Sequence, residues 1–450
     1  MEKRSILEKL PLDNFSVHCV GIGGIGVSAI AEILLEAGCK VSGSDSEYND
    51  CCARLADLGA AVASAGHRKE NLPDYELGGL VMSGAVSMNN EEVVTALRKR
   101  VMAWTRGEFL GELCRCFKRP VMVAGSHGKS SISAMLGWML TRSGVDCGLL
   151  LGAKYQDKSR RACLGNGDII VGEADESDNS LALLSGELAL VSNIDNDHAW
   201  NASAVEAQDK AFVFFAGHFA KTIYLPSEKT GKLFGSLKNC EALTDADFKR
   251  LDALVPARFL GYERSNAVLA LAGAEYLQLD LSKAAAALND YPGIDRRQSV
   301  LYSSGKMLLV EDYAHHPAEL AASLQVLAER GAGRRITVVF QPHRYERLTR
   351  YFDDFVRILS NKDLQVKVLD VFSAWSHGPT DAMTGGDLVR AINHAGGNAE
   401  MISNDFRREA DRLLKAAGQT AVPEMLALIG AGSIHQLTME VYNIIQKQQF

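Results

Sequence analysis

The sequence predicts an α/β protein of three domains, and three observations support this. Short runs of Val, Ile and Leu alternate with segments of helical periodicity along the whole chain, which is the pattern of parallel α/β sheets. Two strand-to-helix junctions carry glycine-rich turns that differ too much in sequence to be copies of one repeat. A length of 450 residues, at about 150 residues per domain, indicates roughly three domains.

The predicted elements follow in chain order. A strand at 17–20 leads into a helix at 27–37, and a strand at 121–124 leads into a helix at 130–142. The last third is a doubly wound unit, with strands at 307–310, 336–340, 366–371 and 425–429 and helices that start near 317, 346, 386 and 405. We place the domains at 1–106, 107–296 and 297–450.

The composition, 47% hydrophobic and 23% charged, is that of an ordinary soluble globular protein and excludes fibres and disorder. A net charge of −7 argues against a dedicated nucleic-acid binder. The nine cysteines form no C-x-x-C pair, residues 1–17 lack the apolar core of a signal peptide, and no apolar run is long enough to span a membrane. We therefore expect a cytoplasmic protein with reduced thiols, no nucleic-acid partner and no membrane span.

The first glycine turn is a G-x-G-x-x-G motif formed by Gly21, Gly23, Gly24 and Gly26, set between a strand and a helix. Glycines permit a tight turn and close approach of the backbone, and the helix start offers free N–H groups to phosphate. Asp45 follows the next strand and is placed to accept from a ribose or a base. The motif alone is weak, because the same glycines also allow a helix and a sheet to pack closely.

The second glycine turn resembles a phosphate-binding loop. It lies directly between an apolar strand and a helix and consists of Gly125, Ser126, His127, Gly128, Lys129, Ser130 and Ser131. Lys129 would neutralise the β and γ phosphates of a nucleotide, and the hydroxyl of Ser130 would face Mg²⁺. The loop departs from the full eight-residue pattern, because Val123 stands where that pattern has its first glycine.

Acidic and amide side chains follow two further apolar runs. One cluster is Glu173-Ala-Asp-Glu-Ser-Asp178, and the other is Asn193-Ile-Asp-Asn-Asp-His198. The carboxyl ends of parallel strands face the ligand crevice of an open α/β sheet, and hard oxygen donors there suit Mg²⁺. Either cluster alone could also be a solvated loop or a helix cap.

Together these motifs resemble those of a known family: the sequence is similar to the Mur ligases of peptidoglycan synthesis over nearly the whole chain, and most of all to the members that add L-alanine. The motifs that carry the resemblance are GIGGIG at 21–26, SGSD at 42–45, GHRKENL at 66–72, SGAV from Ser83, AGSHGKSS at 124–131, EADESD at 173–178, NIDNDH at 193–198, RR at 296–297, DYAHHP at 312–317, FQPHRYERL at 340–348 and GAGSI at 430–434.

The resemblance implies a three-domain, ATP-dependent amide ligase. Its first domain would hold UDP-N-acetylmuramate, the second ATP with Mg²⁺ (or Mn²⁺), and the third L-alanine. The glycine turn at 21–26 would then bind a UDP diphosphate and not NAD. A monomer or a homodimer is expected.

The resemblance also implies roles for single residues. The ATP site would contain Gly125, Ser126, His127, Gly128, Lys129, Ser130, Ser131 and, near adenine, Asn266. Metal would be bound by Ser130, Glu173 and His198. The UDP-sugar would lie near Gly21, Gly23, Gly24, Gly26, Asp45, His67 and Ser83. The amino-acid site would contain Tyr313, His315, His343, Arg344 and Arg347. Catalysis would rest on Lys129, His198, Arg344 and Arg347.

The sequence departs from the family pattern at several places. The usual Thr-Thr after the lysine is Ser130-Ser131, a conservative change, because either hydroxyl can bind Mg²⁺. Tyr262-Glu-Arg264 replaces a His-Asn pair, Gln298 replaces the aromatic residue after the paired arginines, and the stretch 199–256 is short.

Three alternatives stay open from the sequence. One is a recycling ligase that attaches a tripeptide to UDP-N-acetylmuramate. Another is a nicotinamide oxidoreductase, supported by residues 21–26 alone. The third is a catalytically silent nucleotide-binding protein, suggested by the short stretch 199–256 and by Tyr262-Glu-Arg264.

Overall fold

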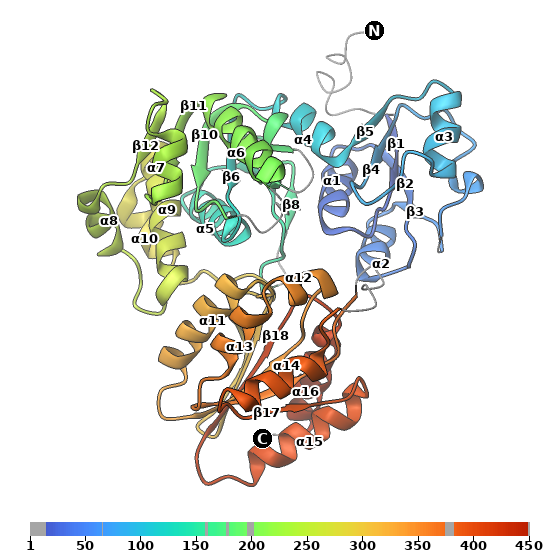
Figure 1. Ribbon diagram of the computed structural model, residues 1–450. Helices are drawn as coiled ribbons and strands as arrows, with labels where there is room; N and C mark the ends of the chain where they lie inside the picture. The colour runs from blue at the N-terminus through green and yellow to red at the C-terminus, as the bar shows by residue number, and fades with distance from the viewer. Residues whose placement is uncertain are drawn as a thin grey trace. The chain divides into compact units, whose positions relative to one another are not determined.

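The computed structural model describes residues 15–64, 66–157, 161–176, 180–195, 202–373 and 382–448. The chain forms two compact units, one of Met1–Phe259 with Glu263–Pro292 and one of Leu260–Tyr262 with Gly293–Phe450. In the described part of the chain, three sheets organise the fold, two in the first unit and one in the second (Figure 1). This arrangement confirms the predicted α/β class. The boundaries at 106 and 296 stay predictions.

The N-terminal sheet has five parallel strands in the order β3-β2-β1-β4-β5. Its strands are β1 (Ser16–Val20), β2 (Lys40–Ser44), β3 (Ala61–Val62), β4 (Gly79–Met82) and β5 (Ala103–Thr105). Its helices are α1 (Ile25–Glu36), α2 (Asp50–Asp57), α3 (Glu91–Arg98) and α4 (Arg106–Cys114). All five residues of β1 are buried, as expected for a central strand that is covered on both faces.

The second sheet has seven strands in the order β12-β11-β10-β6-β9-β7-β8. They are β6 (Arg119–Ala124), β7 (Cys147–Leu150), β8 (Ala162–Cys163), β9 (Ile169–Glu173), β10 (Gly186–Val191), β11 (Phe219–Tyr224) and β12 (Cys240–Ala242). The helices of this part are α5 (Lys129–Arg142), α6 (Ala202–Gly217), α7 (Glu228–Phe234), α8 (Asp245–Asp252), α9 (Gly261–Tyr276) and α10 (Leu281–Ala287).

Strand order places the two glycine turns. The turn after β1 and the turn after β6 both leave the carboxyl end of a central strand that has parallel neighbours on both sides. In open α/β sheets, ligands bind outside the carboxyl ends of strands, where the strand order reverses. Both turns are therefore where a ligand crevice is expected.

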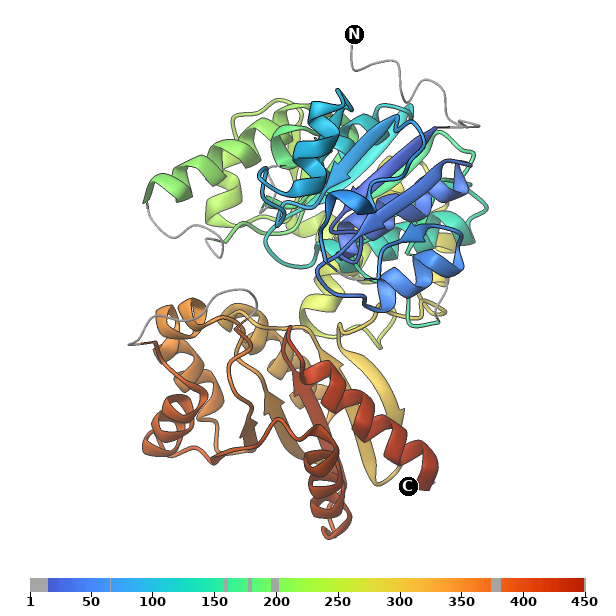
Figure 2. The same ribbon diagram turned by 90° about the vertical axis from the view of Figure 1, so that its right-hand side faces the viewer.

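The sheet of the second unit has six strands in the order β13-β14-β18-β15-β16-β17. They are β13 (Ser299–Ser303), β14 (Met307–Asp312), β15 (Arg335–Phe340), β16 (Leu364–Val368), β17 (Ala399–Met401) and β18 (Glu424–Ile429). The helices are α11 (Pro317–Arg330), α12 (Tyr345–Arg350), α13 (Phe352–Leu359), α14 (Gly385–His394), α15 (Phe406–Gly418) and α16 (Ile434–Gln448). Figure 2 shows α16, in red, lying along the strands of this sheet.

The predicted strands and helices named above are all present, with ends that differ by a few residues. The predicted strand at 366–371 ends at Val368. The structure adds two antiparallel pairings, β7 with β8 and β13 with β14, which the sequence did not predict. β8 has only two residues, too few for a periodic pattern to identify it. No helix of the described residues is long and apolar enough to cross a membrane.

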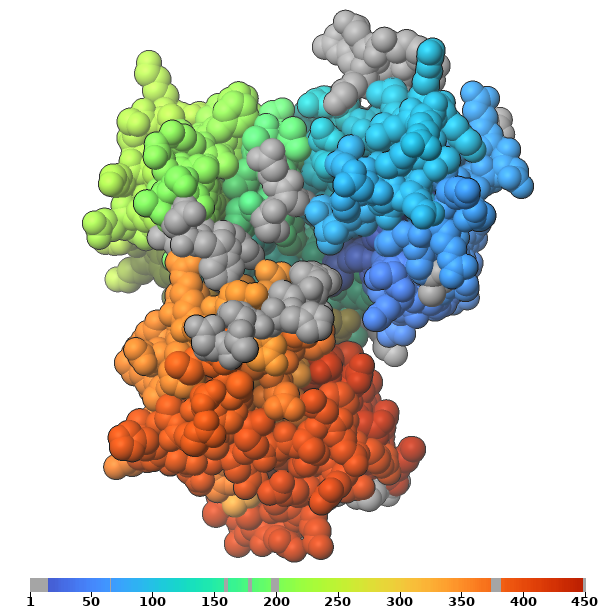
Figure 3. Space-filling model, turned by 45° about the vertical axis from the view of Figure 1, so that its right-hand side comes forward, coloured from blue at the N-terminus to red at the C-terminus, as the bar shows by residue number. Residues whose placement is uncertain are grey.

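A buried arginine joins the two sheets of the first unit. The guanidinium of Arg161, just before β8, donates to Ser28 Oγ at 2.7 Å and lies 3.1 Å from Glu32, both on α1. Its side chain is 2% exposed and that of Glu32 is 5% exposed. Figure 3 shows the blue and teal residues of these two parts packed against each other. This contact links α1, the helix that follows the first glycine turn, to the second sheet.

Replacing Arg161 with methionine should lower the free energy of unfolding of the first unit by about 2–3 kcal/mol, because it removes one partner of a buried ion pair. Arg54, 36% exposed, also pairs with Glu32 and would limit the loss. The measurement is the urea midpoint. Arg250→Met, at a 47% exposed arginine of the same unit, is the control and should cost less than about 0.5 kcal/mol. Equal losses in the two variants would contradict this prediction.

Candidate active site

The first glycine turn is held by backbone hydrogen bonds from the end of β2. The N–H groups of Gly21 and Ile22 both donate to Ser44 O, at 2.8 and 3.0 Å. Gly21 has a φ of +79°, which favours glycine, and a Cβ there would lie 2.8 Å from the Cβ of Ser83. The predicted residues Gly21 and Ser83 are therefore neighbours.

Asp45 lies at the same turn. Its Oδ2 accepts from Gly23 N at 2.8 Å, so the carboxylate helps to shape the turn. A Cβ at Gly23 would lie within 2.9 Å of both Asp45 and Asn49, which explains the requirement for glycine at this position. His67 belongs to the same edge of the sheet, because its Nδ1 is 2.8 Å from Ser44 Oγ.

Arg106 is a further candidate site residue, which was not predicted from the sequence. It begins α4, directly after β5, and a Cβ at Gly26 would lie 2.7 Å from its Nε. A guanidinium beside the start of α1 adds positive charge where a diphosphate is expected. A basic residue directly after the last strand of the predicted first domain was the signal available in the sequence.

The second glycine turn has the backbone of a phosphate-binding loop. Gly125 and Gly128 have φ values of +134° and +86°, and α5 begins at Lys129. A Cβ at Gly125 would lie 2.2 Å from Ser192 Oγ, and a Cβ at Gly128 would lie 2.7 Å from Asn266 Oδ1. Asn266 thus contacts the loop, and its place near adenine stays a prediction. Its Nδ2 is buried and has no hydrogen-bond partner among the described residues, which suits a group that a ligand would satisfy.

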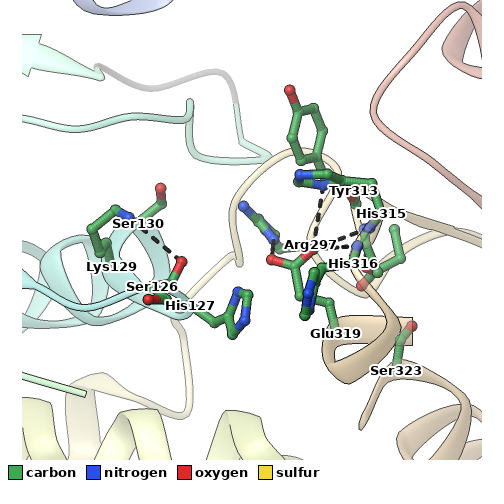
Figure 4. A network of polar contacts seen from close by, with 12 residues as sticks. Ser126, His127, Lys129, Ser130, Arg297, Tyr313, His315, His316, Glu319 and Ser323 are labelled. Carbon is green, nitrogen blue, oxygen red and sulfur yellow. Dashed lines mark hydrogen bonds and ion pairs between the residues drawn. The ribbon is translucent and has the colours of Figure 1, made fainter. Parts of the chain in front are cut away.

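The loop lysine is charged and held in place. Lys129 Nζ donates to Gly125 O at 2.7 Å and to Glu176 at 2.8 Å. Burial lowers the pKa of Lys129, but Glu176, Asp175 and Glu173 outweigh it, so the pKa lies above its ordinary value. Figure 4 shows Lys129 and Ser130 side by side at the start of α5.

Other side chains of the loop are tied to the end of β10. His127 Nε2 lies 3.0 Å from Asp195 Oδ2, and the N–H of His127 donates to Asn193 Oδ1 at 2.9 Å. Ser126 Oγ accepts from Asp195 N at 2.9 Å. The first residues of the second acidic cluster therefore hold the loop in shape. Ser131 lies in the first turn of α5.

The expected metal site is described in part. Ser130 Oγ donates to Glu173 Oε2 at 2.9 Å. Glu173 is 7% exposed, and its other oxygen, Oε1, accepts from Ser133 Oγ and Gly152 N. A hydroxyl and a carboxylate at this distance are the hard oxygen donors that Mg²⁺ prefers, so the residues fit the ion. His198 and Asp178 lie outside the described residues. The described residues contain no group of three or more His, Cys, Asp or Glu that could hold a metal.

The predicted amino-acid residues gather in the second unit. His315 Nδ1 lies 3.0 Å from Tyr313 O and 3.2 Å from Glu319 Oε2. The rings of His315 and His343 are 5.5 Å apart, and Arg347 contacts His343 Nδ1 at 3.2 Å. Figure 4 shows Tyr313, His315 and Glu319 grouped with Arg297.

Arg344 is the last of the predicted amino-acid-site residues. It precedes α12 with a φ of +66°, and its backbone N–H donates to Phe372 O at 2.8 Å. Its Nε is buried without a hydrogen-bond partner among the described residues. Arg297, which lies 3.7 Å from Glu319, and Arg296, which stacks on Tyr313, are further cations that the residue-by-residue prediction did not assign.

Two departures from the family pattern meet at one carboxylate. Gln298 donates to Asp312 Oδ2 through both its backbone N–H, at 2.9 Å, and its side chain, at 3.0 Å, and Tyr262 OH donates to the same oxygen at 3.4 Å. Burial raises the pKa of Asp312, and Arg297 offsets only part of this. Both replacements thus supply hydrogen-bond donors to a buried acid.

Two histidines of the second unit, His315 and His343, have depressed pKa values. Burial lowers the pKa of His315 to about 4, with Arg347 adding to the shift and Glu319 opposing it. Burial, His315 and Arg347 lower the pKa of His343 to about 3. The two rings are therefore neutral at neutral pH, and each has one unprotonated nitrogen that can accept a hydrogen bond.

These shifts predict acid sensitivity of the second unit. Because the unfolded chain binds the protons more readily, the free energy of unfolding should fall as the pH drops from about 6.5 toward 4, by up to ~1.4 kcal/mol per pH unit for each histidine. His343→Gln should reduce this slope, measured as urea midpoints at about pH 7 and about pH 5. His394→Gln, at an exposed histidine of the same unit, is the control. An unchanged slope in His343→Gln would refute the prediction.

Family models match two parts of the chain. The model described as Mur ligase family, catalytic domain, matches residues 16–118, and the model described as Mur ligase, glutamate ligase domain, matches residues 296–432. The first contains the glycine turn at 21–26, and the second contains the cluster around His315.

Curated relatives match along almost the whole chain. UDP-N-acetylmuramate–L-alanine ligase of Endomicrobium trichonymphae is 33% identical, covering 96% of this chain and 100% of the relative. The enzyme of the same name from Sulfurihydrogenibium sp. is 32% identical, covering 94% and 96%. The crystal structure of UDP-N-acetylmuramate-alanine ligase from Thermotoga maritima aligns with a TM-score of 0.78 at 21% identity, covering 96% of this chain and 99% of that one. This last likeness shows the fold.

Proposed function

The chain belongs to the Mur ligase family, and we propose that it joins L-alanine to the carboxylate of UDP-N-acetylmuramate with the use of ATP. The main observation is the loop of Gly125 to Ser130, with a charged Lys129 and with Ser130 next to Glu173. The names of the curated relatives support L-alanine as the amino acid. The product would be a precursor of peptidoglycan.

The chemistry explains the need for a nucleotide site. A carboxylate is a poor electrophile, so an amine attacks it only after activation. Transfer of the γ-phosphoryl group from ATP to the carboxylate forms an acyl phosphate and ADP. Attack by the amine of alanine then forms the amide and releases phosphate. No covalent bond to the protein is needed, so the residues act by positioning and by charge.

Lys129 is the residue that would face the transferring phosphoryl group. Its ammonium would stabilise the negative charge on the phosphate oxygens, and the N–H groups at the start of α5 would bind the phosphates. Ser130 and Glu173 would hold Mg²⁺, with His198 as the predicted further ligand. When bound, the ion supplies positive charge that offsets the charge of the phosphates.

The neutral histidines of the second unit are suited to the amine. Tyr313 O can only accept, so Nδ1 of His315 carries the hydrogen and Nε2 is left as an acceptor. His315 Nε2 can then accept a hydrogen bond from the ammonium group of alanine, and Arg344 and Arg347 would hold its carboxylate. The orientation of these groups toward alanine is part of the proposal.

A coupled ADP-release assay tests the function. Purified protein is mixed with UDP-N-acetylmuramate, ATP and Mg²⁺, and with L-alanine, glycine, L-serine or a free tripeptide in separate reactions. Release with L-alanine and formation of the amide product support the proposal. Release with the tripeptide alone would identify the recycling ligase. Absence of ADP with every acceptor would favour the catalytically silent protein.

The comparisons favour a ligase over the nicotinamide oxidoreductase, which would leave Lys129, Ser130 and Glu173 without a use. Hydride transfer from NADH in the absence of ATP would be the result that supports the oxidoreductase. The cytoplasmic location and the monomeric or dimeric state stay predictions. Cell fractionation and size-exclusion chromatography with light scattering would test them.

A further inference from the structure

Glu92 is a fully buried carboxylate close to the first glycine turn, and the reaction proposed above does not use it. Its side chain is 0% exposed. It lies on the buried face of α3 with Val93 and Ala96. A charged group in such a place is costly unless it is fully hydrogen-bonded.

Four donors from three segments of the chain satisfy this carboxylate. Oε2 accepts from His18 Nε2 at 3.1 Å, on β1, and from Ser44 Oγ at 2.6 Å, at the end of β2. Oε1 accepts from the N–H of Arg68 at 2.9 Å and from Asn71 Nδ2 at 2.6 Å. Each oxygen thus has two donors, which matches the acceptor capacity of an ionised carboxylate.

These contacts keep Glu92 ionised. Burial raises its pKa, but the hydrogen bonds from His18, Ser44 and Asn71 outweigh it, so the pKa lies below its ordinary value. An ionised carboxylate has no hydrogen to donate, so in the short contact with Ser44 the hydroxyl must be the donor.

This assignment settles the hydrogen positions on His67. Ser44 has one hydroxyl hydrogen, and it is already donated to Glu92. In the 2.8 Å contact between Ser44 Oγ and His67 Nδ1, the nitrogen must therefore donate. A neutral His67 then has its hydrogen on Nδ1 and a lone pair on Nε2.

The lone pair lies at the ligand-binding edge. Ser44 O accepts from the N–H groups of Gly21 and Ile22, and Gly66 N donates to Asp45 O at 2.7 Å, so His67 is tied to the glycine turn through one short segment. Its side chain is 24% exposed. Within the described residues, Nε2 of His67 makes no hydrogen bond.

We propose that Glu92 is a positioning residue that acts through Ser44 to present Nε2 of His67 as an acceptor for a hydrogen-bond donor of the uridine, either the uracil N3–H or a ribose hydroxyl. The partner is a donor group of the nucleoside and not a phosphate oxygen, which can only accept. The proposal rests on the proposed function, because that function supplies the UDP-sugar.

The first test compares two serines of the same strand. Ser44→Ala removes the link to His67, whereas Ser42→Ala removes the buried hydrogen bond to His18 Nδ1 and leaves that link intact. Ser44→Ala should raise the KM for UDP-N-acetylmuramate about tenfold, the usual effect of one lost hydrogen bond, with kcat and the KM for ATP within about twofold. Ser42→Ala should leave all three near the parent values. Equal effects of both variants, or a loss confined to kcat, would overturn the proposal.

The second test needs no activity. In ¹⁵N spectra of imidazole-labelled protein, with the His67 signals assigned from His67→Gln, the parent at neutral pH should show a protonated Nδ1 and an unprotonated Nε2. Ser44→Ala should show a mixture of tautomers. A protonated Nε2 in the parent would overturn the proposal even if the ligase activity is established. If the protein shows the expected tautomer but has no ligase activity, the proposed function is refuted and the positioning of His67 is not.

A third test identifies the ligand group. UDP is compared as a competitor with N3-methyl-UDP, 2′-deoxy-UDP and 3′-deoxy-UDP. In the parent, UDP should bind about tenfold more tightly than the analogue that lacks the relevant donor, and Ser44→Ala should lose this preference. Glu92→Gln, where it folds, should match Ser44→Ala, and the double variant should be no worse than Glu92→Gln alone. Equal binding of UDP and all three analogues by the parent would contradict the proposal.

Discussion

Replacement of Lys129 by methionine is expected to reduce ligation by on the order of 10³-fold or more, because methionine keeps the aliphatic stem and removes only the charge that stabilises the transferring phosphoryl group. The measurement is the rate of ADP release and of amide formation at saturating substrate concentrations. Lys118→Met, at an 80% exposed lysine just before β6, is the matched control and should keep the parent rate.

Loss of Lys129 also removes the cation beside Glu176, whose side chain is 1% exposed. An uncompensated buried charge can cost about 3–5 kcal/mol, so the single variant could lose activity through unfolding. Lys129→Met with Glu176→Gln removes both charges and should recover most of the stability while ligation stays abolished. A folded double variant that ligates at a near-normal rate would disprove the role of Lys129.

The second large effect is expected at Glu173. Glu173→Gln keeps the size of the side chain and an oxygen that can accept from Gly152 N, but it removes the negative charge next to Ser130. We expect kcat to fall by about 10²–10³-fold, and the Mg²⁺ concentration for half-maximal rate to rise at least about tenfold. Both quantities come from Mg²⁺ titrations of ADP release.

Glu187→Gln controls for the loss of a carboxylate on the same sheet. Glu187 lies near the start of β10, at the opposite end from the glycine turn, and pairs with Arg119 at 3.5 Å. It should leave the Mg²⁺ dependence unchanged. A Glu173→Gln variant with parent Mg²⁺ dependence and parent kcat would show that Glu173 does not bind the ion.

Much of the fold could be predicted because its signals are local. The strand at 121–124 is a short continuous apolar run, the helix after Lys129 is a longer one, and the glycine turn between them marks where the strand gives way to the helix. The hairpin of β7 and β8 could not be predicted in this way, because pairing between short strands depends on residues that are distant in sequence.

The same limit applies to the site. Lys129, Ser130 and Glu173 could be proposed from motifs, because a phosphate loop and an acid at a strand end have a recognisable order. Arg106, Glu92 and Ser44 could not be assigned a role, because the contact that suggests a role for each comes from another segment of the chain. A glutamate on the apolar face of α3, beside Val93 and Ala96, was the one available sign of a buried carboxylate.

The amino-acid order alone was therefore enough for the α/β class, the two glycine turns and the family, since these follow from short-range periodicity and contiguous motifs. Only the tertiary structure decided which groups share hydrogen bonds. Lys129 pairs with Glu176, Tyr262 and Gln298 both donate to Asp312, and His67 is linked to Glu92 through Ser44. Hydrogen bonds and desolvation act over a few ångströms of space, and segments far apart in the chain come that close only in the packed structure.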